Sequence, residues 1–311
     1  MTATKAAGAS PRAVNALRVG AGSITVAVVC SVCALGFSLW PFFGGQTANP
    51  FAASALLMVL LPAMFMLVLA GFMEGSMDAK TLALLGVLSA AIAAVRPLGA
   101  GVGGVETVFF LLVLGGRAFG PAFGFALGGV SLLASALLTG GVGPWLGMQM
   151  VCSSWIAAGA GLLPGRAGRI RGRAEIAMLA AYGAICSYLF GALMNLWFWP
   201  ALGGAGAGAS GIGYLPGAPV GTNLRHFVAF TLVTSTTSWD TIRAITCVIA
   251  LVVLGGPVLA LLRRAGARAA FGAVPEFGAP NAGSASKAEA SAARMSKPAS
   301  ATVDQPGSGE P

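Results

Sequence analysis

Long apolar runs follow one another along most of this chain, and the links between them are short except before the last run. A helix of about 20 apolar residues spans the hydrocarbon core of a bilayer while pairing its own backbone groups. Hydrophobic residues make up 57% of the chain and charged residues only 9%, against about 25% charged residues in soluble domains. We therefore expect an all-α integral membrane protein. The runs cover about residues 21–43, 50–73, 81–97, 105–117, 119–139, 143–163, 174–199 and 240–262.

These runs predict about eight transmembrane helices in two groups. The first two runs form an N-terminal transmembrane hairpin within residues 21–78, and the first run exceeds the roughly 7–15 residues of a signal-peptide core. The other six runs form a membrane domain over residues 79–268. We expect a cytoplasmic tail at residues 1–20 and a disordered cytoplasmic tail at residues 269–311, whose composition cannot bury enough apolar surface to fold.

The net charge of +9 could indicate a nucleic-acid-binding protein, but the cations gather between apolar runs and at the termini. With the N-terminus in the cytoplasm, every inner link carries positive charge, as the positive-inside rule requires. These inner cations are Lys80, Arg117, Arg166, Arg169, Arg171, Arg173, Arg263, Arg264 and Arg268. The pattern predicts a multi-pass protein of the cell membrane with both termini in the cytoplasm.

Five ionisable residues fall on or near the outer half instead. A charge at the centre of a membrane helix costs about 2.5–3.5 kcal/mol, so such groups are usually paired, close to an interface or directed into a cavity. The five are Arg96, Glu106, Arg225, Asp240 and Arg243. Their grouping favours an outward-facing pocket. In this pocket Arg96 and Arg225 would contact anionic or carbonyl groups of a ligand. Long side chains that reach the lipid headgroups would explain the same pattern.

Aromatic and amide residues at the outer ends of the later runs complete the predicted pocket. Trp at a membrane end is often an interface anchor, whereas an amide in hydrocarbon needs a partner. Flat aromatic walls with a few polar groups are typical of small-molecule sites, which suggests an organic ligand that bears rings and polar groups. The residues are Trp145, Gln149, Asn195, Trp197, Trp199 and Trp239.

Stripes of small residues recur every four positions and let helix backbones approach closely. One stripe, at Gly116, Gly120, Gly124 and Gly128, is expected to serve packing within the bundle. A second stripe on the third run has the same spacing and could contact an external partner helix. It comprises Gly86, Ala90 and Ala94.

Enzyme and metal chemistry find little support in the motifs. All five cysteines lie inside apolar runs and the only histidine is His226, so we expect no disulfide framework, no metal site and no cofactor. No phosphate-binding loop, nucleophile elbow or intramembrane protease cluster is present in the sequence, and we expect no enzyme. The Gly-rich link between Arg96 and Glu106 lacks the strand and helix of a dinucleotide site, and we expect it to cap a pocket instead.

Four segments together resemble a known family. They are LSAAIAAVRP at residues 88–97, VFFLLVLGGRAFGPAFG at 108–124, LTGGVGPWLGMQM at 138–150 and MNLWFW at 194–199. In these segments the chain resembles the substrate-binding (S) component of energy-coupling factor (ECF) transporters, the vitamin-importing ABC systems. The resemblance covers about residues 79–268 and each segment alone is weakly specific.

The resemblance implies a six-helix S-component-like bundle that binds a micronutrient near its outer face. It also implies docking on an ECF transmembrane coupling subunit driven by two cytoplasmic ATPase subunits, through a small-residue stripe that Ala90 and Ala94 match and Gly86 continues. The N-terminal hairpin is additional to the family's six helices. Metal-specific members resemble one another in a histidine directly after the initiator methionine, which this chain lacks, so nickel or cobalt ions are not expected cargo.

Cobalamin, a pyrimidine precursor and other vitamins remain open as ligands, and two other classes of function remain alternatives. A stand-alone secondary transporter would show inverted repeats, and no such internal symmetry is visible in the sequence. A membrane scaffold or enzyme acting at the lipid interface would direct the polar residues toward headgroups.

Overall fold

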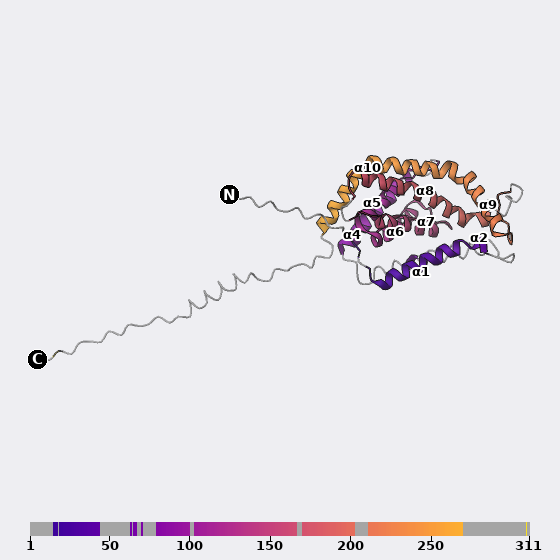
Figure 1. The fold of residues 1–311 in the computed structure, drawn as a ribbon. Helices are drawn as coiled ribbons and strands as arrows, with labels where there is room; N and C mark the ends of the chain where they lie inside the picture. Colours follow the sequence, from indigo (N-terminus) through magenta and orange to yellow (C-terminus); the bar gives the residue numbers. More distant parts are fainter. Residues whose placement is uncertain are drawn as a thin grey trace. The chain divides into compact units, whose positions relative to one another are not determined.

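The computed structural model describes residues 15–17, 19–43, 63, 65–66, 70, 79–99, 103–166, 170–202, 211–269 and 309. Within this part the chain is all-helical, as the sequence predicts, and no strand is present. The elements are α1 (Ala21–Ser38), α2 (Trp40–Phe43), α4 (Ala79–Val95), η1 (Arg96–Leu98), α5 (Phe109–Phe119), α6 (Pro121–Thr139), α7 (Leu146–Leu162), α8 (Arg173–Leu202), α9 (Val220–Thr231), η4 (Leu232–Asp240) and α10 (Thr241–Ala269). All of them belong to the first of two units, Met1–Phe271, and Figure 1 shows their order along the chain.

Four of the described helical segments are long and apolar enough to cross a membrane, which supports the prediction of an α-helical membrane protein. They are Ala79–Leu98, Pro121–Thr139, Arg173–Pro200 and Val220–Arg268. Helices α5 and α7 and most of α1 are shorter apolar helices. Most of the second helix of the predicted hairpin and most of the predicted C-terminal tail lie outside the described residues.

The glycine stripe predicted to serve packing does so between α5, α6 and α7. A Cβ atom added at Gly124 would lie 2.6 Å from the carbonyl oxygen of Ala157, and one at Gly116 would overlap the same oxygen. Gly128 faces the backbone of Ser153 and Ser154 in the same way. Gly120 has a φ of +102° and forms the sharp turn between α5 and α6, a conformation that glycine adopts without strain.

The last helical run begins about twenty residues earlier than the apolar pattern indicates. It starts at Val220 as α9, continues through the π-helical η4 and ends at Ala269 as α10. Ser and Thr residues at 234–238 lower the local hydropathy, yet their hydroxyls can bond to carbonyls of the preceding turn inside a helix. Thr234 Oγ1 donates to the Phe230 carbonyl at 2.7 Å, and Thr241 Oγ1 donates to the Thr236 carbonyl at 2.6 Å.

The helices alternate in direction, so helix starts and helix ends gather at two opposite ends of the described part of the domain. At one end, called the Arg96 end, α4 and α6 finish while α5, α7 and α10 begin. At the other, called the Arg117 end, α5 and α7 finish while α8 begins. There Arg117 Nη1 donates to the Leu163 carbonyl at 2.8 Å. Helix α8 packs against α10 between the two ends, as Figure 1 shows.

Candidate functional site

A cleft of about 300 Å³ opens at the Arg96 end. Its walls come from η1, the link that precedes α5, the last turns of α6, the start of α7 and the junction of η4 with α10. Five residues predicted from the sequence as ligand contacts line this one cleft. They are Arg96, Glu106, Trp145, Trp239 and Arg243.

Arg96 lies on the 3-10 turn that extends α4, where Pro97 follows it. Its Nη2 atom donates to Gln149 Oε1 at 3.0 Å and its Nη1 atom to Ser135 Oγ at 3.4 Å. Both partners are neutral, and no carboxylate of the described residues forms an ion pair with Arg96. Gln149 therefore positions the guanidinium from one face of α7, and the Glu106 carboxylate acts on the charge of Arg96 electrostatically without forming an ion pair with it.

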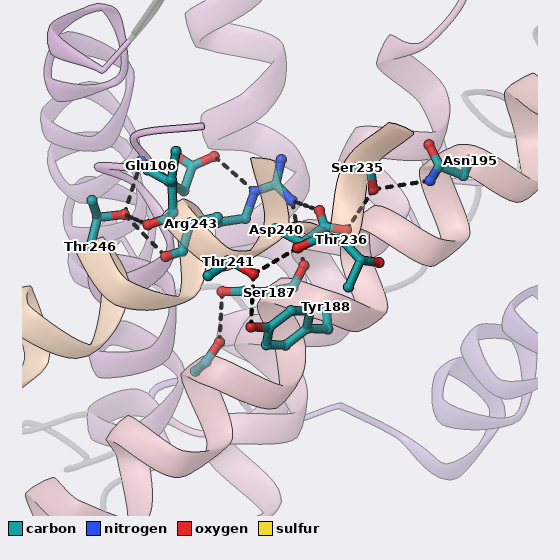
Figure 2. Close-up of polar contacts among 12 residues, drawn as sticks. Glu106, Ser187, Tyr188, Asn195, Ser235, Thr236, Asp240, Thr241, Arg243 and Thr246 are labelled. Atoms are coloured by element: carbon teal, nitrogen blue, oxygen red, sulfur yellow. Dashed lines mark hydrogen bonds and ion pairs between the residues drawn. The ribbon is translucent and has the colours of Figure 1, made fainter. Parts of the chain in front are cut away.

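Arg243 has a different environment, shown in Figure 2. Its Nη1 atom pairs with Asp240 Oδ1 at 2.6 Å, and its Nε atom lies 4.0 Å from Glu106 Oε2. The guanidinium carbon lies 5.0 Å from the centre of the Phe190 ring, a distance at which a cation is attracted to the ring face. Arg243 is thus largely neutralised within the protein and held against α8.

Asp240 lies beneath the cleft rather than in its wall, and its side chain is only 1% exposed. Ser235 Oγ donates to Asp240 Oδ2 at 2.6 Å, and Asn195 Nδ2 donates to Ser235 Oγ at 3.0 Å. The spacing of five residues from Ser235 to Asp240 matches one π-helical turn, so η4 aligns the two side chains (Figure 2). Gly191 of α8 provides the space, because a Cβ atom there would overlap the Asp240 carboxylate.

Glu106 connects the cleft to the start of α5. Its Oε1 accepts from the Val108 backbone N–H at 3.1 Å, and its own N–H donates to Thr246 Oγ1 at 3.2 Å. Burial raises the pKa of the Glu106 carboxyl above its usual range, and the positive charge of Arg243 opposes this shift.

The Gly-rich link lies against the end of η4. A Cβ atom at Gly104, whose φ is +91°, would lie 2.6 Å from the Trp239 carbonyl oxygen. Gly99, Gly104 and Val105 of this link line the cleft. The absence of side chains lets the link approach η4 closely and form one wall of the site.

Three predicted contact residues lie outside this cleft. Trp199 is fully buried, donates from Nε1 to the Ile212 carbonyl at 2.9 Å, and packs 5.4 Å from the ring centres of both Tyr214 and Phe227. Trp197 is buried in the apolar core, and Arg225 extends from the exposed side of α9. Helix α8 continues to Leu202, which places both tryptophans in packing contacts of the bundle.

Several hydroxyl residues belong to the site although the sequence reasoning passed over them. Ser135 and Thr139 line the cleft from the last turns of α6, and Ser235 and Thr246 hold Asp240 and Glu106. The spacing of Ser135 and Thr139 by four residues on an apolar helix is a signal that could have identified them, because it places two hydroxyls on one face.

Comparisons with known proteins returned no matching family model, no matching curated protein and no matching solved structure. Among the described residues, no group of three His, Cys, Asp or Glu side chains is arranged to hold a metal ion. The site is therefore interpreted from its own geometry.

Proposed function

We propose that this chain is the substrate-specificity component of an ECF-type importer and that the cleft at the Arg96 end binds a vitamin or related organic micronutrient. One observation carries the proposal. Two arginines, a glutamate and two tryptophans from separate elements converge on a single open cleft, where a lipid-facing arrangement would have dispersed them.

The residues that line the cleft support an organic ligand with an anionic or carbonyl group and a ring. Arg96, which has only neutral partners, supplies donors for a carboxylate, phosphate or carbonyl group, while Trp145 and Trp239 supply flat surfaces for a ring. A volume of about 300 Å³ lies at the lower end of ligand sites. It suits a compound of one or two rings, such as a pyrimidine precursor, whereas cobalamin would require the Gly-rich link to move away from η4.

The proposed orientation places the Arg96 end outside and the Arg117 end in the cytoplasm. On the Arg117 side, Lys80 and Arg173 lie at the starts of α4 and α8, Arg166 lies in the link after α7, and Arg263 lies in the last turns of α10, in agreement with the positive-inside rule. The protein would then reside in the cell membrane with both termini in the cytoplasm and capture its ligand from outside.

The partner surface of this proposal is the small-residue stripe of α4. Gly86, Ala90 and Ala94 are all exposed, and a Cβ atom added at Gly86 would meet no atom within 4 Å. The glycine stripe at the α6–α7 contact is covered, whereas this one is open to a neighbouring helix. We assign it to the transmembrane coupling subunit, which two separate ATPase subunits would drive. No catalytic step is assigned to the chain.

Purification of the tagged chain from its own cells tests this function. Mass spectrometry of the extracted small molecules should identify one organic compound in about equimolar amount, and the coupling and ATPase subunits should co-purify. The Arg96→Ala variant should lose the compound, whereas Arg225→Ala, which removes an exposed cation outside the cleft, should retain it.

Two results would contradict the proposal. A protein that folds and carries no compound, with no ATPase partners, would indicate a scaffold or enzyme at the lipid interface. A protein that imports the compound in vesicles without ATP or partner subunits would be a secondary transporter.

A further inference from the structure

A second cleft, of about 650 Å³, lies at the Arg117 end between the first turns of α8 and the C-terminal half of α10. Ile176, Val252, Pro257 and Leu259 form apolar walls. Gly256 leaves part of the cleft open, because a Cβ atom added there would meet no atom within 4 Å. We call this cleft the α8–α10 groove.

Positive charge is concentrated beside the α8–α10 groove. Arg117 Nε and Arg263 Nη2 both bond to the same oxygen, Glu175 Oε1, each at 2.7 Å. One carboxylate thus serves two guanidinium groups, and Arg117 Nη2 is buried without a hydrogen-bond partner among the described residues. Arg173, on the rim of the groove, adds an exposed cation.

The positive charges of Arg117 and Arg263 also act on a neighbouring arginine, Arg166. Arg166 lies in the link between α7 and α8, and its Nε atom donates to the Arg117 carbonyl at 3.0 Å. Burial, together with the positive charges of Arg117 and Arg263, lowers the pKa of Arg166 to about 10. An anion close to these arginines would therefore gain favourable electrostatic energy.

The α8–α10 groove also crosses from polar to apolar surroundings. Arg173 and Arg263 lie at its polar rim, whereas Val252, which is 59% exposed, lies more than two helical turns away along α10. Lipid tails contact exposed apolar faces of membrane helices, and basic pockets between such helices bind anionic headgroups. An amphiphile with one negative headgroup matches both parts of the groove.

We propose that the α8–α10 groove binds an anionic phospholipid, with its phosphate beside Arg173 and Arg263 and an acyl chain along Gly256 and Val252. This site is separate from the cleft at the Arg96 end and does not depend on the transport proposal. It requires only that the chain resides in a membrane.

Native mass spectrometry of the full chain in detergent, with added phosphatidylglycerol or phosphatidylcholine, tests the site. The wild-type protein should retain one phosphatidylglycerol at lipid concentrations where phosphatidylcholine is lost. Gly256→Leu should abolish this retention by filling the groove. Arg173→Gln should weaken it about fivefold, the effect typical of one cation near an anionic headgroup.

Two matched controls lie on other helices. Gly36→Leu adds the same side chain to an open position of α1, and Arg225→Gln removes an exposed cation from α9. Both should retain phosphatidylglycerol as the wild type does. Thermal melting establishes that each variant is folded, and Arg173→Gln decides the test if Gly256→Leu does not fold.

Three outcomes would overturn the proposal. The first is equal retention of the two lipids by the wild type, and the second is unchanged retention by a folded Gly256→Leu or by Arg173→Gln. The third is full displacement of the lipid by inorganic phosphate, which would show a phosphate site that does not use the apolar walls.

Discussion

Two arginines in the same cleft have different roles at the scale of single residues. Arg243 pairs with Asp240 at 2.6 Å and lies against Phe190, whereas Arg96 bonds only to the neutral Gln149 and Ser135 among the described residues. The first arginine is a structural partner of Asp240, whereas the second forms no ion pair among the described residues and is the one that the proposed function assigns to the ligand. Substitutions at the two positions should therefore affect different measurements.

Removal of the Arg96 guanidinium should weaken ligand binding with little effect on folding. A charged hydrogen bond contributes about 1.5–3 kcal/mol, so Arg96→Ala should raise the Kd by about ten- to a hundredfold. Isothermal titration with the identified compound measures this change, and thermal melting provides the control. A Kd equal to that of the wild type would show that Arg96 does not contact the ligand.

Removal of the Asp240 carboxylate should instead destabilise the protein. Asp240→Ala leaves Arg243 largely buried without its main partner, and such a loss typically costs about 3–5 kcal/mol. The melting temperature in detergent should fall clearly below that of the wild type. Unchanged melting would mean that Arg243 finds another partner.

Glu106 should make stability depend on pH. Its pKa is raised in the folded protein, so the folded state binds a proton more readily than the unfolded state, and stability falls as the pH rises from the ordinary Glu range to the folded pKa. Glu106→Gln should remove this part of the fall. Melting temperatures measured from acid to neutral pH, with Asp240→Asn as a comparison, would show it. Parallel profiles for wild type and Glu106→Gln would contradict the prediction.

At the scale of elements, η4 decides how the cleft is built. Its π-helical turn aligns Ser235 with Asp240, and Asn195 of α8 extends the chain of hydrogen bonds. Ser235→Ala should cost about 1–3 kcal/mol of stability, because the buried Asp240 carboxylate and the half-buried Asn195 amide each lose a partner. Thr237→Ala, an exposed position of the same element, is the control. Equal melting temperatures for the two variants would show that the hydroxyl of Ser235 is dispensable.

Apolar content made most helices of this chain predictable, and polarity concealed one. The runs between 81 and 199 correspond to helices because lipid-facing segments must be both apolar and helical. The apolar pattern does not predict the helical stretch from Val220 to Asp240. Its Ser and Thr hydroxyls bond to carbonyls within the helix but lower the hydropathy of the sequence. The rarity of charge at membrane depth singles out Arg96, Glu106 and Arg243, which line one cleft in the structure. Trp197 and Trp199 lie outside this cleft in packing contacts, because an aromatic side chain near a helix end serves packing as readily as ligand contact.

At the scale of the whole molecule, larger side chains in the two small-residue stripes should have different effects on stability and partner binding. A Cβ atom at Gly128 would meet the backbone of Ser153 and Ser154, whereas one at Gly86 meets open space. Gly128→Ala should therefore destabilise the protein by about 1–3 kcal/mol. Gly86→Leu should leave melting and ligand binding unchanged while reducing co-purification of the coupling subunit. Retained co-purification would remove α4 from the proposed docking surface.

The Glu175 carboxylate joins three helices at one point. Arg117 comes from α5, Arg263 from α10 and Glu175 itself from α8. All three side chains meet at the Arg117 end, remote from the cleft at the Arg96 end. Two ion pairs to one carboxylate restrain the separation of α5, α8 and α10 at this end. Any local opening that admits a ligand should thus be largest around Arg96 and smallest near Glu175. Amide hydrogen–deuterium exchange rates along α10 should then decrease from its N-terminal end toward Arg263.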